Sequence, residues 1–222
     1  RNGRTGFVAQ VDSIMCRLHL LPLLLLALWA PSSIAAELGT STDEKAQAAV
    51  SKGEVLEQQV AHPATAVTTA APITKAEVKA VDPAGKAPLD DAVVCLSRTI
   101  YWEAKGGGRA DMEAVANVVL NRIGHSGFPD TVCGVVKQGQ EQKHCQFSWW
   151  CDGRSDQVEE KNRYDIAKEI ARKALNKQLS DRTRGAMYFH DRHVSPSWAK
   201  EYIRTAETDE FVFYKPRGGE AR

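Results

Sequence analysis

A series of apolar residues at helical spacing constrains the fold of this chain most strongly. Leu89, Val93, Leu96 and Ile100 precede Glu103 by fourteen, ten, seven and three positions. This spacing predicts a helix whose buried stripe ends in a carboxyl group beside a tyrosine and a tryptophan. Partial burial raises the pKa of a carboxyl group toward neutrality, as a general acid for glycosidic bond cleavage requires. The alternative is a glutamate that turns to solvent at a fraying helix end.

The N-terminal segment has the pattern of an export signal. Met15 and Arg17 precede an apolar run over residues 20–30, and small residues follow up to Ala36. We predict a signal peptide over 1–36, with translation starting at Met15 and cleavage after Ala35 or Ala36. The run is shorter than the roughly 20 residues of a membrane span. We therefore expect an exported product, periplasmic or associated with the cell wall, without stable membrane insertion; an uncleaved anchor is the alternative.

Four cysteines remain after the signal peptide, and an even number in an exported chain predicts disulfides. Of the three possible connectivities we favour Cys145–Cys151, which closes a short aromatic loop, together with Cys95–Cys133. Zinc binding is the competing use, but the chain lacks the usual C-x-x-C and H-x-x-x-H spacings, so we predict no metal site.

Composition divides the remaining chain into three parts. Residues 37–88 are rich in Ala, Thr, Val, Lys and Glu, contain four prolines and lack aromatic residues, which predicts a flexible, disordered linker. Residues 89–216 form the predicted folded domain, and 217–222 a disordered tail. The formal net charge is +1 and no basic stripe is present, so we expect no nucleic-acid partner.

Periodicity within the folded domain predicts an α+β fold that is mostly helical. The expected elements are helices ending near 104, over 111–123 and over 159–177, a helical turn at 198–203 and two short strands at 186–190 and 210–215. The strands would form a small β-hairpin. The long segment 124–158 between the second and third helices is typical of a functional loop.

Five motifs in the domain resemble the SleB/CwlJ-like cell wall hydrolases, the spore cortex-lytic type. The segment 97–105, SRTIYWEAK, is similar to the family signature R-T-I-Y-G-E-A-R, and the other four motifs follow in the family's order at 114–122, 127–136, 146–149 and 186–199. This resemblance implies a lysozyme-like fold, related to lytic transglycosylases, that acts on peptidoglycan glycan strands. It places the catalytic glutamate at Glu103 and implies no cofactor.

Two departures from the family pattern affect the expected mechanism. Glycines occupy 106–108, where the family often has a second glutamate, and Trp102 stands where glycine is usual. Glu113, Asp130 and Asp152 are the candidates for a second carboxylate, and none stands out. A lytic transglycosylase needs one acid, so we favour cleavage between N-acetylmuramic acid and N-acetylglucosamine by Glu103 alone. The alternatives are a hydrolytic N-acetylmuramidase and a non-catalytic peptidoglycan-binding module.

Candidate substrate-binding residues share polar or aromatic groups suited to sugars: Tyr101, Gln146, Phe147, Ser148, Tyr188 and His190. Several have a structural alternative. The aromatic residues of the loop around 147–150 would pack on one another, Tyr101 would belong to the core, and His190 would end a strand. A further alternative is a cysteine peptidase or amidase using Cys145 and the adjacent His144, although sequence neighbours rarely present a nucleophile and its base correctly.

Overall fold

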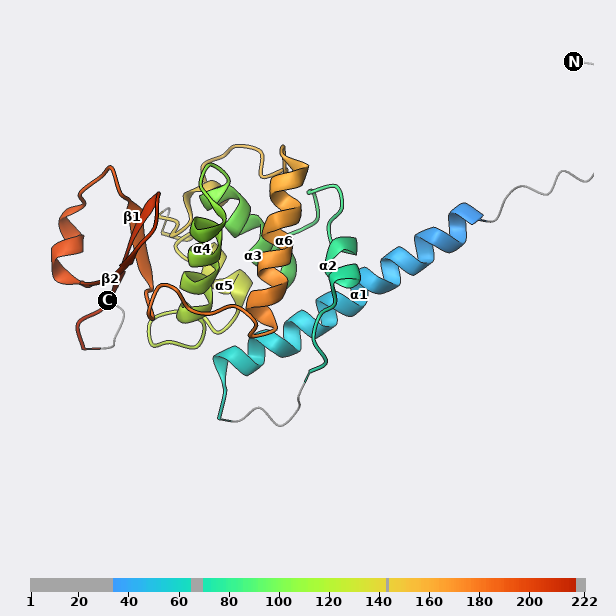
Figure 1. Ribbon diagram of the computed structural model, residues 1–222, viewed down its shortest axis with the longest axis horizontal. Helices are drawn as coiled ribbons and strands as arrows, with labels where there is room; N and C mark the ends of the chain where they lie inside the picture. The colour runs from blue at the N-terminus through green and yellow to red at the C-terminus, as the bar shows by residue number, and fades with distance from the viewer. Residues whose placement is uncertain (1–33, 65–69, 143, 219–222) are drawn as a thin grey trace, which may run out of the picture. The chain divides into compact units, whose positions relative to one another are not determined.

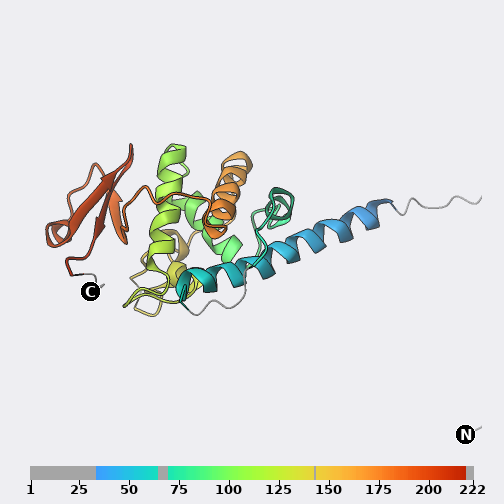
Figure 2. The same cartoon turned by 60° about the horizontal axis from the view of Figure 1, so that its bottom comes forward.

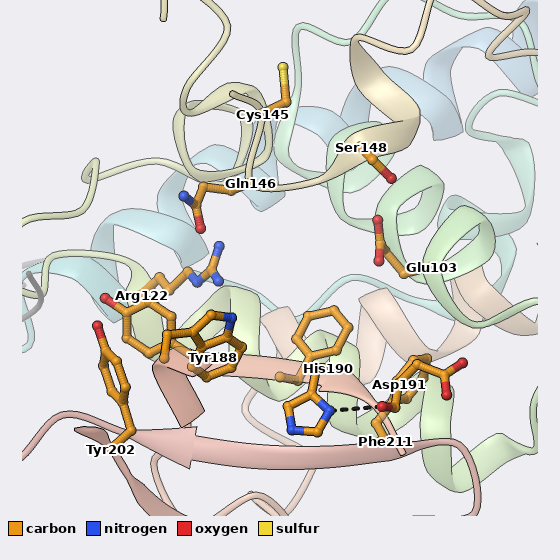
Figure 3. A pocket seen from close by; sticks show the side chains of 12 residues that line it. Glu103, Arg122, Cys145, Gln146, Ser148, Tyr188, His190, Asp191, Tyr202 and Phe211 are labelled. Carbon is orange, nitrogen blue, oxygen red and sulfur yellow. Dashed lines mark hydrogen bonds between the residues drawn. The ribbon is translucent and has the colours of Figure 1, made fainter. Parts of the chain in front are cut away.

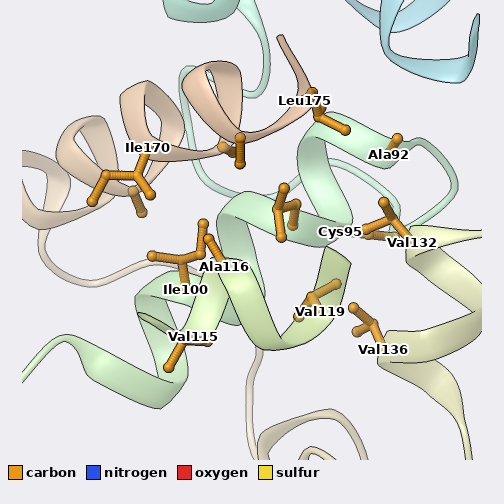
Figure 4. Packing of buried hydrophobic residues seen from close by; sticks show 14 of the residues in the cluster. Ala92, Cys95, Ile100, Val115, Ala116, Val119, Val132, Val136, Ile170 and Leu175 are labelled. Atoms are coloured by element: carbon orange, nitrogen blue, oxygen red, sulfur yellow. The ribbon is translucent and has the colours of Figure 1, made fainter. Parts of the chain in front are cut away.

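The centre of the domain is an apolar helix enclosed by three others. The computed structural model describes residues 34–64, 70–142 and 144–218. Helix α3 (Ala92–Ala104) packs against α4 (Arg109–Arg122), α5 (Val132–Lys137) and α6 (Lys161–Leu175) (Figure 1). Residues 92–101 of α3 are all buried, and their neighbours on the surrounding helices complete one core (Figure 4). A helix buried on every side is the expected centre of such a domain.

Local capping explains where the central helices begin. Asp91 caps α3, and its Oδ1 accepts the backbone N–H groups of Val93 and Val94, both at 2.9 Å. Helix α4 begins after Gly108, whose N–H donates to Asp111 Oδ2 at 2.7 Å. The predicted helix ending near 104 is confirmed. The predicted second helix begins two residues earlier than expected, because Asp111 is its third residue and accepts the N–H of Gly108 from there.

A three-stranded antiparallel sheet replaces the predicted hairpin. Strands β1 (Tyr188–Asp191), β2 (Ile203–Glu207) and β3 (Phe211–Lys215) have the order β1-β3-β2. The short helical segment η2 (Ser197–Glu201) ends before 203, so the helical turn predicted for 198–203 is wrong at its end. Strand β2 is mostly exposed and pairs with β3, so its own sequence has no clear alternation of apolar and polar residues.

Helix α4 holds this sheet in place through hydrogen bonds. Asn121 Nδ2 donates to the carbonyl of Ala186 at 3.1 Å, and Arg122 Nε donates to the carbonyl of Met187 at 2.7 Å. At the other end of α4, Asp111 Oδ1 accepts the N–H of Glu210 at 3.1 Å. Both views show the sheet beside α4 (Figures 1 and 2).

Over 37–64 and 70–88, the described parts of the flexible linker predicted for 37–88, the structure has packed helices instead. Helix α1 (Ile34–Ala61) packs against α3 and α6, and α2 (Lys75–Ala80) packs against α1 and α6. The apolar residues that join the core are few and widely spaced, which is why the sequence shows no stripe: Ala49, Leu56, Ile73, Val78 and Val81. Their burial depends on the surface that α3 and α6 provide.

Asp82 fastens the end of this N-terminal segment to the core. Its Oδ2 accepts Arg98 Nε at 3.0 Å, Arg98 Nη2 at 2.8 Å and the Tyr164 hydroxyl at 2.8 Å. Its Oδ1 accepts the N–H groups of Lys86 and Ala87 at 2.7 and 2.9 Å. Asp82 and Arg98 are both almost fully buried, so this ion pair joins α3 and α6 to a segment that composition assigns to the linker.

Both favoured disulfides are present. Cys95–Cys133 joins α3 to α5, and Cys145–Cys151 brackets the short helix η1 (Ser148–Trp150). The second bond leaves Cys145 without a free thiol, which removes the cysteine peptidase alternative. Most of the predicted signal peptide and tail lie outside the described residues, within which no helix is long and apolar enough to cross a membrane.

Candidate active site

A cavity of about 540 Å³ lies between the ends of α3 and α4, the disulfide loop and the sheet (Figure 3). Its lining comprises Glu103, Arg122, Cys145, Gln146, Ser148, Tyr188, Phe189, His190, Asp191, Trp198, Tyr202 and Phe211. Helix α3 contributes its last turn, α4 its last residue, and the sheet the whole of β1. The hydrogen bonds between α4 and the sheet therefore also fix the width of the cavity.

Glu103 is the acid in this cavity. Its carboxyl group points into the cavity on the side of the Ser148 hydroxyl (Figure 3). Burial raises the pKa of Glu103 to about 7, although the positive charge of Arg122 opposes the rise. Among the described residues no hydrogen bond or ion pair holds the carboxyl group. At neutral pH a large share of Glu103 is therefore protonated and available to donate a proton.

Arg122 places a buried positive charge opposite Glu103. The side chain is 3% exposed, its Nε donates to Met187, and its guanidinium carbon lies 5.1 Å from the ring centres of both Phe128 and Phe147. Its Nη1 has no hydrogen-bond partner among the described residues. Burial lowers the pKa of Arg122 to about 10, so the group stays charged at neutral pH. It therefore stabilises a negative charge that forms in the cavity.

Aromatic rings from the sheet and η2 form one wall of the cavity. The ring centre of Tyr188 lies 4.6 Å from that of Tyr202 and 6.2 Å from that of Trp198, and His190 lies 5.6 Å from Trp198. His190 is oriented by the Tyr214 hydroxyl, 3.1 Å from its Nε2, and by the carbonyl of Asp191, 2.7 Å from its Nδ1. Such a wall offers apolar ring faces and polar edges to a sugar chain.

Four of the six predicted substrate-binding residues line this cavity with Glu103: Gln146, Ser148, Tyr188 and His190. Tyr101 and Phe147 do not, and both are fully buried. Tyr101 lies two residues before Glu103 and so on the opposite side of α3, where its hydroxyl accepts the N–H groups of Glu159 and Glu160. Phe147 packs beneath Arg122, because the loop alternates exposed Gln146 and Ser148 with a buried ring.

Several lining residues were not predicted from the sequence, notably Arg122, Asp191, Trp198 and Tyr202. Arg122 and Trp198 belong to the family motifs at 114–122 and 186–199, and these motifs could have identified them as site residues. Asp191 follows His190 on β1 and had no signal of its own. Among the described residues no group of His, Cys, Asp or Glu is arranged to hold a metal ion.

The three carboxylates considered from the sequence lie outside this cavity. Glu113 is bound by Arg109 at 3.0 Å and by Arg182 at 2.5 Å, and neither Asp130 nor Asp152 belongs to the lining. Within the described chain Asp191 is the one other carboxylate of the lining. Its Oδ1 accepts the N–H of His193 at 2.7 Å, and the carboxylate points away from Glu103 (Figure 3).

A half-buried acid facing an aromatic wall is suited to bind a sugar chain and to protonate its glycosidic oxygen. Residues 106–214 match the family model described as Cell Wall Hydrolase. This domain is therefore similar to the cell wall hydrolases, as the motifs predict. The match begins just after Glu103, so the role of this residue rests on the geometry and the sequence resemblance.

Similar proteins include a spore cortex-lytic enzyme of Halalkalibacterium halodurans, 29% identical over 120 residues. That alignment covers 52% of this chain but 32% of the relative, so the chain spans about a third of the relative's length. The catalytic domain of the germination-specific lytic transglycosylase SleB from Bacillus anthracis is 25% identical, with a TM-score of 0.46 over 59% of this chain and 98% of that chain. The SleB catalytic domain of Bacillus cereus is 24% identical, with a TM-score of 0.45 over 56% of this chain and 89% of that chain.

The charge of Arg122 predicts a specific change in pH dependence. Replacing Arg122 with Met removes the charge that opposes protonation of Glu103, so the pKa of Glu103 rises further. For cleavage in which Glu103 donates the proton, the basic limb of the kcat/KM profile on purified sacculi is expected to move to higher pH. Arg122→Lys keeps the charge and serves as the control. An unmoved limb in Arg122→Met, alongside a normal melting temperature, would show that the two groups are not coupled.

Proposed function

We propose that this chain cleaves the glycan strand of peptidoglycan between N-acetylmuramic acid and N-acetylglucosamine, as a lytic transglycosylase with Glu103 as its single catalytic acid. The observation that carries the proposal is the Glu103 carboxyl group, with a pKa raised to about 7, pointing into a cavity walled by aromatic rings. The match of residues 106–214 to the cell wall hydrolase family supports peptidoglycan as the substrate.

The proposed reaction uses Glu103 twice. The protonated carboxyl group donates its proton to the glycosidic oxygen, and the bond between that oxygen and the muramoyl C1 breaks. The resulting carboxylate takes the proton from the C6 hydroxyl of the same muramoyl residue while the C6 oxygen bonds to C1. The product carries a 1,6-anhydro end, and Glu103 is protonated again. Between the two transfers Arg122 stabilises the Glu103 carboxylate.

Hydrolysis by an N-acetylmuramidase is the second candidate, and Asp191 is the observation in its favour. A hydrolase needs a second carboxylate as base or nucleophile roughly 5–10 Å from the acid. Asp191 lines the cavity, but its contact with the His193 N–H and its direction in Figure 3 make it less suited to activate water near Glu103. This geometry favours transglycosylation.

Mass spectrometry of muropeptides released from purified sacculi distinguishes these reactions. We expect anhydro ends, which are one water lighter than reducing ends, and we expect Asp191→Asn to release the same products. Reducing ends that disappear in Asp191→Asn would establish hydrolysis instead. If the folded wild-type chain released no products, the result would favour the alternative of a non-catalytic peptidoglycan-binding module.

We also propose that the protein works outside the cytoplasm, in the periplasm or at the cell wall. Two disulfides within one small domain fit an oxidising compartment. Peptidoglycan, the proposed partner, lies in the same compartment.

A further inference from the structure

A second cavity, of about 460 Å³, adjoins the candidate active site. Ser148 belongs to the lining of both cavities. On the far side of Ser148 the lining is formed by the last turn of α3, the loop after the Cys145–Cys151 disulfide, and Glu159. Trp102 and Lys105, which flank Glu103 in sequence, line this second cavity. The second cavity therefore lies next to Glu103, on the other side of Ser148.

Hydrogen bonds and ring contacts hold the second cavity in shape. The carbonyl of Asp156 accepts Trp102 Nε1 at 3.2 Å and Arg98 Nη1 at 2.5 Å, which fixes the loop against α3. Lys105 Nζ lies 4.3 Å from the ring centre of Trp102 and 3.2 Å from Glu159 Oε2. Trp102 stands where the family usually has glycine, so this wall is a feature of this chain.

The lining carries charges of both signs. Lys105 and Arg154 supply cations, whereas Asp152, Asp156 and Glu159 supply carboxylates. The glycan strand offers hydroxyl and N-acetyl groups, which are neutral. The peptide stem on each muramoyl residue carries carboxylates and a free amine. Lys105 is paired with Glu159, and Arg154 Nε lies 4.0 Å from Asp152 Oδ2. Such mixed charges match the carboxylates and amine of the stem better than they match further sugar residues.

We propose that the second cavity binds the peptide stem attached to the muramoyl residue at the cleaved bond. This inference rests on the proposed function, since it takes the strand to lie in the first cavity with its cleaved bond at Glu103. Lys105 and Arg154 bind the stem carboxylates, and the three carboxylates bind its amine. The stem is attached to the same muramoyl residue whose C1 carries the cleaved bond, so it begins within one sugar residue of Glu103.

The cleavage test compares two substrates made from the same sacculi: strands with their stems, and strands whose stems an amidase has removed. For the wild-type chain we expect a higher kcat/KM on stem-bearing strands. In Lys105→Gln/Arg154→Gln the ratio between the two substrates should fall about tenfold, equivalent to about 1.4 kcal/mol. Lys161→Gln, an exposed lysine outside both linings, should keep the wild-type ratio. A ratio that stays unaltered in the double variant would overturn the inference.

A binding test separates this inference from the proposed function. The probe is the free stem tetrapeptide, titrated calorimetrically into the wild-type chain and into Arg154→Gln, whose substitution lies on a side chain 86% exposed and so leaves the fold intact. Weaker binding to the variant supports the stem site, even if neither substrate is cleaved and the catalytic proposal fails. Cleavage of both substrates without any tetrapeptide binding would contradict the stem site but not the proposed catalytic function.

Discussion

Glu103→Gln is expected to lower the release of muropeptides from sacculi by about 10²–10⁴-fold, the contribution of a positioned general acid. The amide has nearly the same shape as the protonated carboxyl group but cannot donate its proton to the glycosidic oxygen. Release is measured by chromatography of soluble products at a fixed enzyme concentration. Glu141→Gln, at an exposed loop position, is the control and should retain wild-type activity.

Stability measurements on Glu103→Gln test whether unfolding causes the loss of activity. An unfolded glutamate ionises near pH 4.3, whereas Glu103 in the folded chain ionises near 7. Ionisation of Glu103 is thus harder in the folded state. The contribution of Glu103 to the free energy of unfolding is therefore fully present below pH 4.3 and is lost as the pH rises through 7. Glu103→Gln removes this penalty and should be at least as stable as the wild type at pH 8. Wild-type activity in a folded Glu103→Gln variant would show that the acid lies elsewhere.

Asp82→Asn is expected to lower the free energy of unfolding by about 3–5 kcal/mol, because it leaves the Arg98 guanidinium buried without its counter-charge. The backbone at Asp82 has a φ of +43°, which asparagine tolerates well, so the change tests the side-chain contacts with Arg98 and Tyr164 and not backbone strain. Urea unfolding followed by circular dichroism measures the loss. Asp90→Asn, at an exposed position, should cost well under 1 kcal/mol. A similarly small loss for Asp82→Asn would mean that the buried Asp82–Arg98 ion pair contributes little to the stability of the fold.

The sequence predicted the parts of the fold that depend on local periodicity. The stripe from Leu89 to Ile100 identified the central helix and placed Glu103 at its end, where the structure has it. The apolar and aromatic run over 186–190 predicted a strand there, and Tyr188 and His190, two of the predicted substrate-binding residues, line the cavity. Such patterns survive folding because each residue needs only its own helix or strand to reach its position.

Features that depend on partners far along the chain were not predictable in the same way. Asp82 looks like a linker residue until Arg98 and Tyr164 are brought to it. Arg122 looks like a helix-end charge, and its burial depends on the rings of Phe128, Phe147 and Tyr188. Buried charges of this kind are set by tertiary contacts, and neither hydropathy nor spacing reveals them.

The most direct test of the account is the ionisation of Glu103 itself, followed by the carbon NMR signal of its side-chain carboxyl group in the wild-type chain. Glu103→Gln assigns the signal by its disappearance. We expect a Glu103 pKa of about 7 and a basic limb of kcat/KM at the same pH, since that profile reports the pKa of the catalytic acid in the free enzyme. A Glu103 pKa near 4.3, the value of an exposed glutamate, would contradict it.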